Sequence, residues 1–155
     1  KYYDGQVPIP NTLTQVDQET LQALRDLPNE IAASLEKYRF REASQTMMKI
    51  ARLGNKYLAD EEPWKKIKTD PDRVQTIMHT ALQVAAVLSL VSIPFLPHTA
   101  EKLRYLLGLP QQANWSELSQ DEWLAPSSQL QTPELVFERI DDSAIETQIE
   151  KLQNT

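Results

Sequence analysis

The longest apolar stretch of the sequence places the strongest constraint on its fold. It runs from Val84 to Leu96 and is interrupted only by Ser89, Ser92 and Pro94. This stretch is too short to span a bilayer, and the apolar residues that precede it recur at helical spacing. A helix that is apolar nearly all round must be buried by its neighbours. The sequence therefore predicts a central helix inside a bundle, with no membrane as a partner.

Composition favours the same architecture. The 155 residues include only three glycines and ten prolines, which is typical of helices separated by proline stops. The length is enough for one domain with its own core. The chain has no cysteine, which excludes disulfides and thiolate metal sites. Because the first residues are polar, they do not resemble a signal peptide, and we expect a cytoplasmic protein.

Apolar periodicity and proline positions predict an all-α helical bundle with four main helices. The first begins near Thr14 or Asp17 and reaches residue 35, and Pro28 is expected to kink or divide it. The others span about 40–60, 71–92 and 97–108. Residues 1–110 are expected to form the bundle. Residues 111–155 are expected to form an irregular tail that packs on it, with a short extended segment over 134–140 and a short last helix.

The distribution of charge singles out the second helix. The net charge of −6 argues against nucleic acid, yet residues 37–73 contain 10 basic and 6 acidic side chains. On this helix the apolar stripe starts at Phe40, and a basic stripe lies on the opposite side with no acid to neutralise it. The stripe could contact an RNA backbone, although a plain solvated face is the simpler alternative. Its members are Arg41, Lys49, Arg52 and Lys56.

The stretch "NKYLADEEPWKKIK" places a tryptophan where a core residue is not expected. Trp64 follows a helix end and the rigid Pro63, and three lysines come directly after it. One interpretation is that Trp64 packs back onto the bundle. The other is that it stacks on an unpaired base, as in recognition of RNA loops, while the lysines contact phosphates. These lysines are Lys65, Lys66 and Lys68.

No group of residues predicts catalysis or a metal site. The two histidines, His79 and His98, lie on different predicted helices without companions at metal-ligand spacing. Three glycines leave little room for a phosphate-binding loop or a nucleophile elbow. The adjacent acids at 60–62 are interpreted as solvated residues at a helix end. We therefore expect no enzymatic activity from this chain alone.

The quoted stretch, followed by "IPFLPHTAEKLRYLLG", resembles the anticodon-binding helical domain of methionyl-tRNA synthetases, which are class I enzymes. The opening "KYYDGQVP" and the late "LVFERIDDSAIETQI" fit the start and tail of the same region. The resemblance implies a helical bundle that binds the CAU anticodon stem-loop of methionine tRNA. It implies that Trp64 holds the first anticodon base, a cytosine, and that Lys1 lies near the anticodon. Asn55, Tyr57 and Pro63 match positions that we interpret as structural support.

The resemblance also implies parts that this chain does not contain. In the family the bundle begins with a helix carrying an Asn-x-x-x-Arg pair, which is expected upstream of Lys1. The catalytic domain of the family is also absent from this sequence. In the family that domain binds ATP with Mg²⁺, and it is also a candidate to hold a structural zinc. The expected partners are methionine tRNA and the catalytic domain of the same polypeptide. DNA is not an expected partner. Two alternatives stay open: an anticodon-binding domain of the valine or leucine enzymes, and a protein-interaction module anchored by Trp64.

Overall fold

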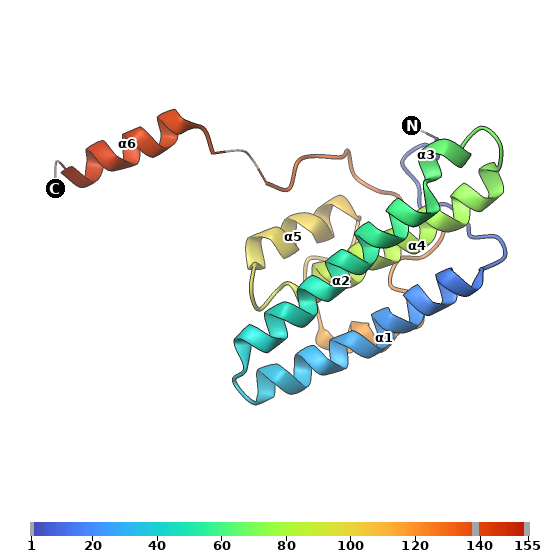
Figure 1. Cartoon of the computed structure of the whole chain (residues 1–155), viewed down its shortest axis with the longest axis horizontal. Helices are drawn as coiled ribbons and strands as arrows, with labels where there is room; N and C mark the ends of the chain where they lie inside the picture. Colours follow the sequence, from blue (N-terminus) through green and yellow to red (C-terminus); the bar gives the residue numbers. More distant parts are fainter. Residues whose placement is uncertain (1, 138–139, 154–155) are drawn as a thin grey trace.

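The computed structural model describes residues 2–137 and 140–153 and shows an all-α bundle (Figure 1), which confirms the predicted fold class. Within these ranges no β-strand occurs, and one isolated antiparallel bridge joins Gln6 to Gln129. The helices are α1 (Gln15–Glu36), α2 (Phe40–Glu61), α3 (Pro63–Lys66), α4 (Pro71–Val91), α5 (Pro97–Leu106), the 3₁₀ helix η1 (Trp115–Ser119) and α6 (Asp142–Gln153).

Helix α4 lies at the centre of the bundle. α1 and α2 form an antiparallel hairpin, and α4 packs against both of them and against α5. By length and composition alone α4 could cross a membrane, since an 18-residue window of it has a mean hydropathy of 1.5. However, 67% of that window is buried within the fold, which is typical of the core helix of a bundle. Gly54 lies where α2 meets α4, and a Cβ there would come within 2.7 Å of Val84 Cγ1.

Helix α1 continues through Pro28, so of the two outcomes expected there, a kink or a division, the division does not occur. It is one 22-residue element, and Pro28 is itself buried. A proline inside a helix removes one backbone hydrogen bond. Here Leu24 and Ile31, one turn before and one turn after it, are both fully buried, and their packing on α2 and α4 keeps the helix in register. The expected start is confirmed, because Thr14 caps α1 and its backbone N–H donates to Asp17.

The apolar stripe of α2 differs at both ends from the expected one. Phe40, expected in the core, is 56% exposed because it is the first residue of α2. Tyr57, which the stripe omitted, is buried. The buried part of α2 therefore lies closer to its C-terminal end than expected. This end carries Tyr57 and is where α1, α2 and α4 converge.

The buried side chain of Gln83 helps to hold the first part of the tail on the bundle. Gln83 accepts hydrogen bonds from the backbone N–H groups of Trp123 and Leu124 at 2.9 and 3.0 Å, and donates to the Leu124 carbonyl at 2.7 Å. Trp123 and Leu124 are buried in the core. Trp115 lies beside α1 and is partly exposed. Both tryptophans thus lie on the bundle.

The last part of the tail differs from the expectation that all of residues 111–155 pack on the bundle. The expected short last helix is α6, which begins at Asp142, but none of its residues is buried, and it extends away from the other helices (Figure 1). Residues 134–137 and 140 form no strand, and positions 138–139 of the expected extended segment lie outside the described residues. Compaction therefore ends near Leu130, the last tail residue that contacts the core.

Candidate functional site

The turn after α2 presents Trp64 to solvent. Glu62 ends α2 in the left-handed conformation (φ 44°, ψ 56°), and Pro63 then starts the four-residue helix α3, which was not predicted. Pro63 is buried and has the fixed φ that a first helical position requires. The indole of Trp64 is 61% exposed, so Trp64 does not pack back into the core.

A buried carboxylate braces this turn from below. Asp17 is fully buried at the start of α1. It accepts hydrogen bonds from the Thr14 backbone N–H at 2.8 Å, from the Tyr57 hydroxyl at 2.5 Å and from the Arg73 guanidinium, the last including a 2.9 Å contact from Nη2 to Oδ1. The bidentate Arg73 ion pair adds geometric specificity. Helices α1, α2 and α4 are thereby joined at one point.

The brace continues into α3 itself. Arg73 Nη2 also lies 3.0 Å from Glu61 Oε2, in the last turn of α2. The same Glu61 oxygen accepts a hydrogen bond from Lys66 Nζ at 2.9 Å. Glu61 therefore connects α4 to the helix that carries Trp64. We call Asp17, Tyr57, Glu61, Lys66 and Arg73 the brace.

The ionisation of the brace follows from these contacts. Burial alone would raise the pKa of Asp17, but hydrogen bonds from Arg73, Tyr57 and Thr14 outweigh it and lower that pKa below its ordinary value. Burial acts the same way on Glu61, and hydrogen bonds from Lys66 and Arg73 lower its pKa. The hydrogen bond to Asp17 raises the pKa of Arg73 despite burial. The folded brace thus favours its charged form.

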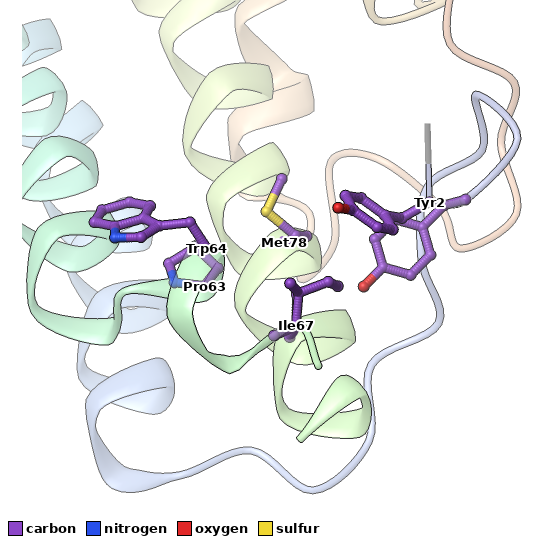
Figure 2. A pocket seen from close by; sticks show the side chains of 7 residues that line it. Tyr2, Pro63, Trp64, Ile67 and Met78 are labelled. Atoms are coloured by element: carbon purple, nitrogen blue, oxygen red, sulfur yellow. The ribbon is translucent and has the colours of Figure 1, made fainter. Parts of the chain in front are cut away.

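An apolar groove opens beside the turn. It has a volume of about 410 Å³ and is bordered by Trp64 and Pro63 on one side. Figure 2 shows Tyr2 on the other side, with Ile67 and Met78 between. Pockets of this size that are mainly apolar commonly hold part of a ligand. The remaining lining residues are Tyr3 and Val74.

The sequence of the chain matches one protein family. The family model described as the anticodon binding domain of methionyl tRNA ligase matches residues 7–155 of the chain.

The chain belongs to this family.

Known relatives agree with the assignment. The methionine–tRNA ligase of Flavobacterium psychrophilum is 47% identical over 156 residues, which cover all of this chain and 23% of that protein. The ligase of Cytophaga hutchinsonii is 48% identical over 155 residues, covering all of this chain and 22% of that protein. The crystal structure of free methionyl-tRNA synthetase from Mycobacterium tuberculosis superposes with a TM-score of 0.85 at 25% identity, over 91% of this chain and 29% of that one. The chain thus spans less than a quarter of the length of each of these two ligases.

The predicted basic side chains of this anticodon-binding domain fall into three groups. Lys49 and Lys56 pair with Glu30 and Asp60, so the expectation that no acid neutralises the stripe is wrong. The prediction missed Glu30 because it lies on the neighbouring helix α1. It missed Asp60 because this acid lies beyond the last residue of the stripe, one helical turn after Lys56. Neither lysine lines the Trp64 groove.

The second group lies on and after α3. Lys65 pairs with Glu62, and Lys66 is the member of the brace that holds Glu61. The third group has no ion pair within the described ranges; it consists of Arg41, Arg52 and Lys68. Of these, Lys68 directly follows the groove residue Ile67 and is exposed.

Of the three predicted supporting residues, two lie at the turn and one does not. Pro63 and Tyr57 are buried at the turn. Asn55 is exposed and lines a separate groove between α2 and α4, away from Trp64. Lys1 lies outside the described residues. Among the described residues, no group of three or more His, Cys, Asp or Glu side chains is arranged to hold a metal ion.

Proposed function

We propose that this domain binds the anticodon stem-loop of methionine tRNA. In this proposal Trp64 stacks on the first anticodon base, a cytosine in the CAU anticodon. The observation that carries it is the exposed indole on a turn that a buried ion-pair network fixes. A rigid aromatic surface beside an apolar groove offers a base-stacking site without ordering a flexible loop first. Base–aromatic stacking is worth about 1–3 kcal/mol by alanine substitution.

Phosphate contacts complete the proposed interface. Lys68 and Arg52 are available without breaking an ion pair. Lys49, Lys56 and Lys65 can exchange an exposed carboxylate for a phosphate at little cost, because surface ion pairs are worth about 0–1 kcal/mol. Lys66 already holds Glu61, so its main role in this proposal is to fix the turn. Lys1 is proposed as a further contact near the anticodon.

The domain serves a longer enzyme in this proposal. The relatives that it matches are named as methionine–tRNA ligases, and they are more than four times its length. We propose that a catalytic domain in the same polypeptide binds ATP with Mg²⁺ and attaches methionine in the cytoplasm. The present chain supplies anticodon recognition and contributes no catalytic residue.

A binding titration tests the proposal. An RNA hairpin with a CAU loop and a matched hairpin with the first anticodon base changed are titrated with the chain at low salt. We expect the CAU hairpin to bind more tightly, and Trp64→Ala to remove the difference. The control variant is Tyr38→Ala, because Tyr38 is an exposed aromatic at the opposite end of α2. If Trp64→Ala and Tyr38→Ala weaken binding equally, the proposed role of Trp64 is wrong.

A further inference from the structure

The groove beside Trp64 contains a second exposed aromatic side chain. Tyr2 is 64% exposed, close to the 61% of Trp64, and both border the same cavity. In Figure 2 the indole lies at one end and Tyr2 at the other, with Ile67 and Met78 between them. The groove therefore has Tyr2 at one end and Trp64 at the other, and the Trp64 indole points away from Ile67 and Met78 in Figure 2.

Tyr2 is attached to an anchored segment rather than to a loose end. The next residues are held by backbone hydrogen bonds to the tail, from Val7 N–H to the Ser128 carbonyl at 2.9 Å and from Leu130 N–H to the Gly5 carbonyl at 2.7 Å. Val7 is buried in the core. The tail thus holds the segment that directly follows Tyr2 and Tyr3.

We propose that Tyr2 is a second stacking surface, which binds the unpaired base next to the one that stacks on Trp64. This inference rests on the proposed function, since it assigns a second base to the same site. An aromatic ring accepts any base, because every base has a π-face. Unpaired loops offer consecutive bases that can be separated in this way. Ile67 and Met78 supply the apolar floor between the two rings.

The arrangement favours two bases over one base held between the two rings. Pro63, Ile67 and Met78 lie between the indole and Tyr2 in Figure 2, so the rings do not face each other across a single slot. The lining of the cavity of about 410 Å³ includes both Tyr2 and Trp64.

A double-mutant cycle between protein and RNA tests the inference. Fluorescein-labelled CAU hairpins are prepared intact or with one abasic nucleotide, either at the first anticodon position or at one of its two neighbours. Each is titrated at low salt with the wild-type chain and with Trp64→Ala, Tyr2→Ala, Tyr2→Phe and the control Tyr38→Ala. An abasic site removes a stacking base while keeping the phosphate, so the coupling between variant and abasic site isolates the stacking contact.

We expect Tyr2→Ala to weaken binding of the intact hairpin about 5- to 150-fold, the range for one base–aromatic stack. The loss should vanish on a hairpin that lacks one neighbour of the first anticodon base, and Tyr2→Phe should bind like the wild type. Trp64→Ala should couple only to the first position.

Other outcomes overturn the inference in distinguishable ways. If Trp64 couples to the first base and Tyr2 to none, the second stacking surface is wrong while the proposed function stands. Coupling of Tyr2 to the first base would indicate one base between both rings. If the wild-type chain binds none of the hairpins, the proposed function and this inference both fall.

Discussion

The two ends of helix α2 carry similar surface features but differ in what lies beneath them. At one end, Tyr38 is 82% exposed, adopts a left-handed backbone (φ 57°) and lies among basic side chains. At the other end, the left-handed Glu62 (φ 44°) precedes the exposed Trp64 and three lysines. The brace and the apolar groove both lie at the Trp64 end. Next to Tyr38 the side chains form the exposed Arg39–Glu42 pair.

This difference shows that exposure and charge do not by themselves define a binding site. The segment Lys37–Arg41 alternates basic and aromatic residues more regularly than the segment around Trp64 does. What distinguishes the Trp64 end is that its backbone is fixed by buried ion pairs, so its aromatic ring is oriented before a ligand arrives. Pre-organisation of this kind lowers the entropy lost on binding.

Removing the centre of the brace should have the largest effect. Asp17→Ala leaves Arg73 and Tyr57 without their shared acceptor in a buried position. Breaking a buried ion pair by removing one partner typically costs about 3–5 kcal/mol, and we expect a loss of that size in the free energy of unfolding. Urea denaturation followed by circular dichroism measures it.

The other end of α2 supplies the control for this variant. Glu42→Ala breaks the exposed pair with Arg39 and should change the free energy of unfolding by less than about 1 kcal/mol. Similar losses for Asp17→Ala and Glu42→Ala would mean that the two ends of α2 are equally supported, and that the brace does not distinguish them.

Acidification should weaken the brace in a defined pH range. The pKa values of Asp17 and Glu61 are both lowered in the folded chain by hydrogen bonds from their partners. Their contribution is complete above the ordinary carboxyl pKa of about 4, and it is lost as the pH falls through the lower folded values. The free energy of unfolding should therefore fall steeply below about pH 4.

Glu61→Gln sharpens this prediction, because it removes one of the two titrating groups. Denaturant titrations from pH 6 to 2.5 should show a large stability difference between wild type and variant at pH 6, which narrows as the pH falls. A difference that stays constant over the whole range would show that the charge of Glu61 does not contribute to stability.

The sequence was sufficient to predict most of the fold and the exposed residues of the site, which are Trp64 and the lysines after it. Apolar periodicity, the cap at Thr14 and the prolines at 71 and 97 are local signals, and the corresponding helices occur as predicted. Tertiary packing decided the exceptions. Pro28 does not interrupt α1, and Phe40 lies beyond the core because α2 begins there.

Tyr57 was expected as a supporting residue, but its buried partners Asp17 and Arg73 and the second aromatic were not predicted, because the residues that meet there are far apart in sequence. Asp17 lies 40 residues from Tyr57 and 56 from Arg73. One signal was present, since Asp17 is in helical register with Leu21 and Leu24 on the apolar face of α1. A charged residue in an apolar stripe requires a buried partner, but the sequence does not say which of the 16 basic residues provides it. Tyr2 carried no local pattern at all.

The lysines after Trp64 should respond differently to salt. Each phosphate contact adds about 0.7–0.9 to the slope of log affinity against log salt concentration. Lys68→Ala should reduce the slope for the CAU hairpin by about 1, since Lys68 has no carboxylate partner in the part of the chain that the structure describes. Titrations between 50 and 200 mM salt measure this slope.

Lys66→Ala is the matched variant two residues away. It should lower stability by releasing Glu61 while leaving the slope unchanged. If Lys66→Ala reduces the slope as much as Lys68→Ala does, then Lys66 leaves Glu61 to contact phosphate, and its assignment to the brace in the bound state is wrong.

The smallest expected effect comes from replacing Tyr38 and Glu62, the left-handed residues at the two ends of α2, with glycine. A non-glycine residue in this conformation is strained by roughly 1–2 kcal/mol, and glycine relieves the strain but loses about 0.5–1 kcal/mol through the flexibility of the unfolded chain. Tyr38→Gly and Glu62→Gly should thus each raise the free energy of unfolding by up to about 1 kcal/mol. Only Glu62→Gly should weaken binding of the CAU hairpin, by about twofold, because it loosens the turn that orients Trp64. Equal affinity for both variants would show that the brace alone, without the backbone strain at Glu62, sets the position of the indole.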